Sequence, residues 1–328
     1  MRKESIYEAI LNDIMNASIS ENYKNKMLKN VMRLKAQKMN IMITGATGCG
    51  KSSTINAIFG TEVAEVGFGV DPETMEIRKY ELDNLVLWDT PGLGDGKEAD
   101  NRHTKNIIKK LSEVDENGNA LIDLVLVILD GGSRDLGTAY ELISKVIIPN
   151  FGEGKENRIL VAINQADTAM KGHNWDYDKN EPNQKLVNFL EEKVWSVQDR
   201  VYEATGIIVE PIYYSAGYKD GWGEQSRPYN LSKLLYYIVK ATPSEKRAIY
   251  VNNINENREM WRDDDKLLDY GEATRKSIFE SIREGASIGA DIGGAIGSIF
   301  GSAGETIGRS VGGVIGGVIG AIGGLFGL

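Results

Sequence analysis

The feature that most constrains this chain is a glycine-rich segment at residues 45–52. It reads Gly-Ala-Thr-Gly-Cys-Gly-Lys-Ser and fits the pattern Gly-x-x-x-x-Gly-Lys-Ser/Thr. A strand-like apolar segment at residues 39–44 precedes it, and a helical pattern at residues 52–59 follows it. Glycines let backbone N–H groups surround phosphate oxygens, and the N-terminus of the following helix adds a favourable potential. We therefore predict a phosphate-binding loop in which Lys51 reaches the β- and γ-phosphates and the Ser52 hydroxyl ligates magnesium.

Beyond this loop, strand-like and helix-like segments alternate. Residues 124–129 read Leu-Val-Leu-Val-Ile-Leu without polar alternation, as expected for a strand covered by helices on both faces. The chain is thus predicted to have an α/β fold, with a mostly parallel sheet between helices. The strand candidates are 39–44, 75–82, 85–89, 121–130, 158–164 and 207–214, and the helix candidates are 52–59, 101–111, 137–146, 183–204 and 231–240.

Four regions follow from these patterns. We expect N-terminal helices at 1–38, the α/β domain at 39–243, a helical extension at 244–284 and a glycine-rich tail at 285–328. In the first region, Ser18 and Glu21 fit a capping box before the second helix. In the third, the charged residues 262–265 are typical of a solvated surface.

Composition narrows the classes of protein. The 328 residues are 41% hydrophobic and 26% charged, as in ordinary globular proteins, and the net charge of -9 gives no reason to expect a DNA partner. Cys49 is the single cysteine, so no intramolecular disulfide forms. The first residues lack the apolar core of a signal peptide, which favours a cytoplasmic location.

Three further polar stretches end predicted strands and suit a phosphate-binding loop. Asp89 begins Asp-Thr-Pro-Gly, where a carboxylate would hold the magnesium shell and Gly92 would move toward a γ-phosphate. Residues 164–167 read Asn-Gln-Ala-Asp, and the Asp167 carboxylate can accept from two donors on guanine that adenine lacks. Residues 215–216, Ser-Ala, end a third strand with backbone N–H groups available for the guanine carbonyl.

In their order and spacing, these four stretches resemble the G1, G3, G4 and G5 motifs of translation-factor-class GTPases, over about residues 39–243. The Era-like branch fits best, including the bacterial YeeP- and YfjP-type proteins and, more distantly, the immunity-related GTPases. The resemblance implies GTP or GDP and Mg²⁺ as cofactors. It implies that Ser52, Thr74 and Asp89 lie at the metal and that Lys51, Thr74 and Gly92 take part in hydrolysis. The implied nucleotide-binding residues are Gly45, Ala46, Thr47, Gly48, Cys49, Gly50, Lys51, Ser52, Ser53, Asn164, Gln165, Asp167, Ser215 and Ala216.

The sequence departs from this family pattern at three positions. Gln165 replaces the usual lysine of the base-binding motif, which leaves a side chain able to lie over the purine but without charge. Leu93 stands where many small GTPases carry the glutamine that orients the attacking water, so intrinsic hydrolysis should be slow. Gly48 stands where potassium-stimulated relatives carry asparagine, so potassium activation is not expected.

Other residue assignments remain open. Thr61 is an alternative to Thr74 as the switch threonine, and Arg78 and Arg134 are candidate arginine fingers for which a surface role is the simpler interpretation. Cys49 raises the hypothesis that its alkylation blocks nucleotide binding, against the simpler view that a small residue is tolerated there. His103 and His173 have no metal-ligand spacing and are assigned no site.

The tail has a regular glycine pattern. Glycine recurs every fourth residue from Gly285 to Gly301 and again from Gly304 to Gly324, which would place the glycines on one ridge of a helix. Glycine costs about 1 kcal/mol per position in an exposed helix relative to alanine, so such a helix needs a partner or a membrane. Membrane association, self-association and a disordered or internally packed tail are the alternatives.

We therefore expect a Mg²⁺-dependent GTPase switch coupled to a tail that associates with a membrane or with itself. One alternative is a GTP-binding module that hydrolyses negligibly and binds a protein or ribosome, which Leu93 keeps open. Another is a membrane-acting effector that GTP licenses. Homo-oligomerisation is compatible with the glycine pattern.

Overall fold

The computed structural model describes residues 6–16, 20–60, 76–94, 96–133, 136–152, 154–218 and 226–286. Within these ranges a six-stranded sheet has the order β2-β3-β1-β4-β5-β8, with β2 antiparallel to β3 and the remaining neighbours parallel. The predicted α/β fold with a mostly parallel sheet is confirmed. The strands are β1 (Met39–Gly45), β2 (Arg78–Leu82), β3 (Leu85–Asp89), β4 (Leu124–Asp130), β5 (Ile159–Asn164) and β8 (Ile212–Tyr213).

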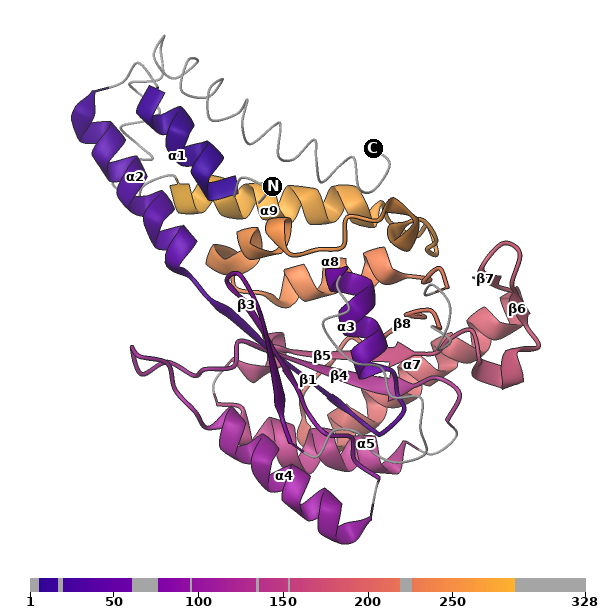
Figure 1. Cartoon of the computed structure of the whole chain (residues 1–328). Coiled ribbons are helices and arrows are strands. Elements are labelled where there is room, and N and C mark those ends of the chain that lie inside the picture. The colour runs from indigo at the N-terminus through magenta and orange to yellow at the C-terminus, as the bar shows by residue number, and fades with distance from the viewer. Residues whose placement is uncertain are drawn as a thin grey trace.

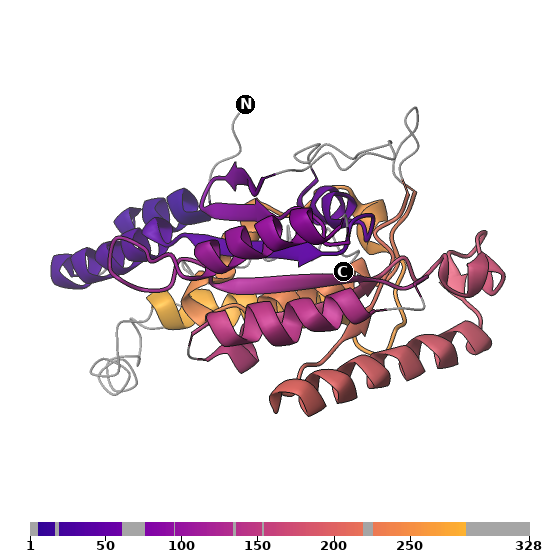
Figure 2. The same cartoon turned by 90° about the horizontal axis from the view of Figure 1, so that it is seen from below.

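Helices cover both faces of this sheet (Figure 1). On one face lie α3 (Lys51–Phe59), α8 (Leu231–Ala241) and α9 (Tyr270–Ala286), together with the N-terminal pair α1 (Ile6–Asn16) and α2 (Glu21–Ala36). On the other lie α4 (Lys97–Leu111), the sequence of short helices from α5 (Gly137–Glu141) to α6 (Ile148–Asn150), and α7 (Gln184–Thr205). Figure 2 shows the two helical layers on either side of the sheet.

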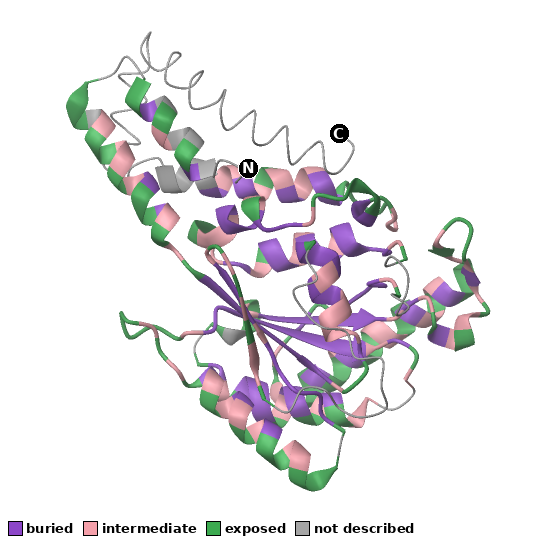
Figure 3. Ribbon diagram, viewed as in Figure 1, coloured by how far each residue is buried: buried purple, intermediate pink, exposed green. Residues whose placement is uncertain are grey.

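Burial explains why the central strands lack alternation. Side chains of β1, β4 and β5 contribute alternately to the two hydrophobic clusters, so that Ile41 packs on one face and Met42 on the other. These three strands are accordingly almost wholly buried, whereas the outer helices α4 and α7 bury one side only (Figure 3). A continuous apolar run is therefore the pattern that this sheet requires.

Several predicted boundaries move for identifiable reasons. The expected strand at 207–214 is reduced to β8, because Pro211 has no N–H to donate to a ladder. The expected strand at 121–130 begins only at Leu124, because the Leu121 N–H bonds instead to the Glu113 carbonyl. The helix expected at 137–146 widens into a π-helix at Leu142–Ile147, just before Pro149.

The N-terminal helices also differ in detail from expectation. Ser20 precedes α2 and makes no side-chain capping bond, while Ser18 lies outside the described residues. The apolar side chains of the pair do reach the core, since Tyr7, Ile14 and Val31 belong to the same cluster as β1. A small antiparallel ribbon of β6 (Trp175–Asp176) and β7 (Glu181–Pro182) precedes α7.

The segment after α8 is not a continuous helical extension. It forms 3-10 turns at Ser244–Asn252 and Arg258–Trp261 before α9 begins at Tyr270. Tyr250 and Trp261 are buried in the cluster that also holds β1. Among the described residues, no helix combines the length and the apolar character needed to cross a bilayer. The glycine pattern from residue 287 onward lies outside the described residues.

Candidate functional site

The glycine-rich loop connects β1 to α3 as its sequence predicts. Gly45, Gly48 and Gly50 all have positive φ, of 153°, 78° and 88°. A Cβ atom at Gly45 would lie 2.1 Å from the Ile128 carbonyl oxygen, and one at Gly50 would lie 2.2 Å from the Asn164 amide nitrogen. Glycine is thus required here by conformation and by space, and the loop wraps closely at the carboxyl ends of β1, β4 and β5.

Lys51 and Asp89 bring opposite charges to this loop. The Lys51 ammonium donates to the backbone carbonyl of Ala46, at 3.2 Å, so its side chain turns back over the loop. Asp89 ends β3, where it pairs in register with Ile43 of β1, and is 2% exposed. Burial raises the pKa of the Asp89 carboxyl to about 6, although Lys51, Arg78 and a hydrogen bond from Ser52 favour its charged form.

The Asp89 carboxylate has an unused oxygen. Its Oδ1 atom is buried and has no hydrogen-bond partner among the described residues, while the Ser52 hydroxyl lies beside the same carboxylate. Buried polar atoms normally have partners, so an orphaned carboxylate oxygen needs an explanation. Carboxylate and hydroxyl oxygens are hard ligands of the kind that Mg²⁺ prefers together with phosphate oxygens. Ser52 and Asp89 therefore fit the expected magnesium ion.

The predicted base-binding stretch follows β5 and lies against the loop. The Asn164 amide donates to the Cys49 carbonyl at 2.9 Å, and its Oδ1 accepts from the Ala216 N–H at 2.9 Å. Gln165, with a φ of 61°, donates through Nε2 to the Gly48 carbonyl at 2.7 Å. The departure from lysine thus places an uncharged side chain across the loop, where it contacts the backbone.

Asp167 and Ser215 complete this group. The Ser215 hydroxyl donates to Asp167 Oδ1 at 2.6 Å, which fixes the carboxylate that is predicted to contact guanine. Tyr214, next to Ser215, has a buried hydroxyl 2.6 Å from Thr54 Oγ1 of α3. The base-binding loop is therefore linked directly to the helix that follows the phosphate loop.

Gly92 and Leu93 pack directly on the phosphate loop. The Leu93 N–H donates to the Gly45 carbonyl at 3.4 Å, and the Thr47 N–H donates to the Leu93 carbonyl at 3.1 Å. A Cβ atom at Gly92 would lie 2.2 Å from Thr47 Oγ1. The Leu93 side chain is 6% exposed and belongs to the same hydrophobic cluster as Met42, so it supplies no polar group to the site.

His103 is a residue that sequence reasoning missed. It was assigned no site, yet its Nδ1 atom lies 3.0 Å from the Gly92 carbonyl oxygen, and its side chain is buried. Near it on α4, Asp100 Oδ1 accepts from the Gly94 N–H at 2.9 Å. No local motif could have indicated this, because a lone histidine within a polar helix carries no signature.

Cys49 has a less reactive environment than the alkylation hypothesis requires. Its side chain is 1% exposed and belongs to the hydrophobic core. Burial raises the pKa of the Cys49 thiol, with Lys51 partly opposing the effect. Because the thiolate is the reacting species, both features disfavour alkylation of the folded protein.

The remaining predicted residues have varied outcomes. Thr74, Thr61 and Arg134 lie outside the described residues, so no geometry is assigned to them. Arg78 begins β2 opposite Asp89 and acts on that carboxylate as a nearby positive charge, while Ser53 lies in the first turn of α3. His173 is exposed and remains without an assigned site.

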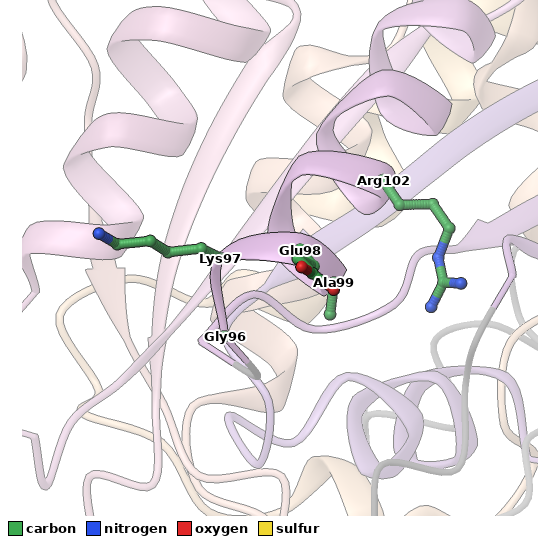
Figure 4. A pocket seen from close by; sticks show the side chains of 5 residues that line it. All are labelled: Gly96, Lys97, Glu98, Ala99 and Arg102. Carbon is green, nitrogen blue, oxygen red and sulfur yellow. The ribbon is translucent and has the colours of Figure 1, made fainter.

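A separate pocket of about 500 Å³ lies at the first turn of α4. Figure 4 shows its lining residues, with Lys97 and Arg102 extending in opposite directions. The lining residues are Gly96, Lys97, Glu98, Ala99 and Arg102. Since these side chains carry both signs of charge and include none of the strand-end residues above, this pocket is distinct from the predicted nucleotide contacts.

Asn230 and Lys233, at the start of α8, bond to residues just before α9. The Asn230 N–H donates to the Asp263 carbonyl at 2.9 Å, and the Asp265 N–H donates to Asn230 Oδ1 at 2.8 Å. Lys233 forms a buried ion pair with Asp265 at 2.7 Å. Residues 262–265 are therefore not a solvated charge run, because three of the four charged side chains face partners within the fold.

Known proteins resemble this chain over part of their length. Translocase of chloroplast 34 from Pisum sativum is 31% identical over 145 residues, covering 43% of this chain and 44% of that protein. Interferon-inducible GTPase 1 from Mus musculus is 44% identical over 62 residues, covering 17% and 15%. The uncharacterized protein YfjP of Escherichia coli K12 is 28% identical over 148 residues, covering 44% and 47%. The chain thus matches less than half the length of each of these relatives.

The family of this chain is shown by a match that covers half of its length. The model of the AIG1 family matches residues 39–202, which is half of the chain and contains the phosphate loop, Asp89 and the 164–167 stretch. The predicted likeness to YfjP-type proteins and immunity-related GTPases is confirmed. The family and the donor set of the site agree with GTP or GDP and Mg²⁺ as cofactors. The chain belongs to the AIG1 family.

Proposed function

We propose that this chain binds GTP with Mg²⁺, hydrolyses it slowly and acts as a nucleotide switch. The observation that carries the proposal is the convergence of four separate stretches at one edge of the sheet. Asn164 contacts both the phosphate loop and Ala216, and Asp89 presents a buried, unpartnered oxygen beside Ser52. Such an arrangement serves one ligand that carries phosphates, a metal and a base.

Slow hydrolysis follows from the groups beside the phosphate loop. The Leu93 side chain is packed in the core and cannot orient a water molecule. Lys51, predicted to stabilise charge on the β- and γ-phosphates, and Gly92 are the described residues proposed to act on the γ-phosphate. Thr74 is proposed to complete the magnesium shell with Ser52 and Asp89. Turnover would then depend on positioning and electrostatics, since no general base is assigned.

Base selection provides the first test. An Asp167→Asn variant should lose affinity for GTP by about tenfold to 100-fold and gain relative affinity for xanthosine triphosphate, because an amide cannot accept both guanine donors. Asp178→Asn, in the exposed turn between β6 and β7, is the matched control and should leave both affinities unchanged. Unchanged base preference in Asp167→Asn would show that the base lies elsewhere.

We further propose that nucleotide state is coupled to the C-terminal part of the chain. The base-binding loop ends at Asn230, which bonds to the backbone of Asp263 and Asp265, and Tyr270 of α9 donates to the Asp265 carboxylate at 2.8 Å. These contacts support a route from the guanine site to α9. In the sequence, the tail at 285–328 begins where α9 ends, and it would be the output of the switch.

For the tail, the glycine spacing supports association with a membrane or with a second tail. Residues 310–328 carry no charged side chain, and the run has a length near the about 20 residues that span a bilayer. Flotation with anionic liposomes should separate the alternatives when the full chain is compared with a variant ending at Glu284. Equal flotation of both would contradict the membrane role. A larger molecular mass in solution for the full chain than for a monomer, lost in the truncated variant and seen without lipid, would favour self-association.

The two remaining functions are also separable. A GTP-binding module for a protein or ribosome should show nucleotide affinity but no turnover above that of a Lys51→Ala variant, with or without lipid. A membrane-acting effector should release the contents of liposomes only with GTP present and only with an intact tail. The proposed switch instead requires measurable, slow turnover and tail-dependent association that differs between GTP and GDP.

A further inference from the structure

The segment from Thr90 to Gly94 uses nearly all of its backbone donors within the protein. The Thr90 N–H bonds to the Ile43 carbonyl, Leu93 to Gly45, and Gly94 to the Asp100 carboxylate. Pro91 has no N–H. Within the described part of the chain, the Gly92 N–H has no acceptor. This leaves one donor beside the phosphate loop, at the residue predicted to move toward a γ-phosphate.

The peptide plane after Gly92 is held at both ends. Its N–H, from Leu93, bonds to the Gly45 carbonyl at 3.4 Å, and its C=O, from Gly92, lies 3.0 Å from His103 Nδ1. A carbonyl oxygen can only accept, so this contact requires a proton on Nδ1. On the other side Thr90 is bonded to Ile43 and Pro91 has a fixed φ, so the plane after Gly92 anchors the second end of the short segment that carries the Gly92 N–H.

The surroundings of His103 indicate that its ring is committed to this contact. The side chain is 1% exposed, and its Nε2 atom is buried without a hydrogen-bond partner among the described residues. A ring retained for packing alone would be replaceable by an apolar side chain that leaves no buried polar atom unsatisfied. Asp100 lies three positions earlier on the same face of α4 and holds the next peptide group.

We propose that His103 is a positioning residue that orients the Gly92 N–H toward the γ-phosphate and thereby makes the site distinguish GTP from GDP. This inference rests on the proposed function, because it assigns a role at the same nucleotide site. His103 acts through the Gly92 peptide and does not itself contact nucleotide. Its loss should weaken binding of the triphosphate and slow turnover while leaving the diphosphate affinity largely intact.

The amide side chains allow an atom-by-atom test. In His103→Asn the amide nitrogen occupies the position of Nδ1 and can still donate to the Gly92 carbonyl. In His103→Gln it occupies the position of Nε2, and in His103→Leu there is no donor. Affinities for GDP and for a non-hydrolysable GTP analogue with Mg²⁺ are measured on the full chain by titration, and GTP turnover is measured in parallel.

The expected result is a selective loss. In His103→Leu and His103→Gln the GTP-analogue affinity should fall by about fivefold to tenfold relative to that for GDP, the value of one hydrogen bond. His103→Asn should retain the wild-type ratio and most of the turnover. Equal weakening of both nucleotides in all variants, or an Asn variant as defective as the Leu variant, would overturn the proposal in favour of a packing role.

Failure of the proposed function gives a different result. If the wild-type chain binds neither nucleotide, the nucleotide site itself is wrong, whereas wild-type discrimination in all three variants contradicts only the role of His103. Thermal unfolding of each variant without nucleotide checks folding. If the Leu variant does not fold, comparison of the Asn and Gln variants still tests the proposal, because the two carry the same amide group on side chains of different length.

Discussion

Asp89 and Asp265 are both nearly buried, yet their surroundings differ. Asp89 ends β3 with one oxygen that has no partner among the described residues, and burial raises its pKa to about 6. Asp265 lies between α8 and α9, where its oxygens accept from Lys233, from the Tyr270 hydroxyl and from the Leu267 N–H. The first carboxylate is incomplete without a ligand, and the second completes the fold. Burial alone therefore does not distinguish a carboxylate that awaits a ligand from one that stabilises the fold. The number of hydrogen-bond partners does.

The largest effect should come from removing the well-partnered carboxylate. Asp265→Ala leaves the buried Lys233 ammonium without its partner and should lower the free energy of unfolding by about 3–5 kcal/mol. Urea unfolding followed by circular dichroism measures this change. A double variant, Asp265→Leu with Lys233→Met, should recover much of the loss. No recovery would mean that the Tyr270 and backbone contacts, and not the ion pair, hold this region.

Replacing Asp89 should change the free energy of unfolding in the opposite direction. In Asp89→Asn, without metal or nucleotide, loss of a buried charge that lacks one partner should raise the free energy of unfolding by about 1–3 kcal/mol. The same variant should lose the dependence of GTP affinity on Mg²⁺. Unfolding in EDTA and nucleotide titration with and without Mg²⁺ test both parts. A destabilised variant would show that Asp89 is satisfied within the fold.

The dependence on pH sharpens this contrast. Because the pKa of Asp89 is raised from 3.8 to about 6 in the folded state, the folded protein binds more protons than the unfolded chain between these values. The stabilising effect of protonation is therefore present below about pH 4 and is lost as the pH rises through 6. In EDTA, the stability of wild type relative to Asp89→Asn should fall by about 1 kcal/mol per pH unit across this window. A flat difference would contradict the assignment.

The smallest effect should come from an exposed pair. Lys240 and Glu210 lie 3.2 Å apart with side chains that are 53% and 64% exposed. Glu210→Gln should change the free energy of unfolding by about 0.5 kcal/mol or less, because water screens the pair. Urea unfolding at low and high salt measures it. A loss as large as that of Asp265→Ala would show that pairing matters here more than burial does.

Sequence patterns indicated the residues of the candidate site more readily than the tertiary contacts that support them. The phosphate loop and the strand-end residues Asp89 and Asp167 are recognisable because each motif is short and its chemistry is local. The Asp263 and Asp265 side chains were misread as solvated, because Asn180 of the β6–β7 ribbon and Lys233 of α8, which contact them, lie 83 and 32 residues away in the chain. His103 was missed for the same reason, since its role depends on a tertiary contact with Gly92.

The edges of the sheet limit how this chain can assemble. At one edge, β2 exposes Lys79 and Glu81, whose side chains pair with each other at 2.8 Å. At the other edge, β8 has two residues. Charged side chains on edge strands and very short edge strands are two means by which proteins prevent sheets from pairing edge to edge. We therefore expect a second copy to dock through helices or loops, because the sheet formed by the described residues offers no long, flat edge strand for pairing.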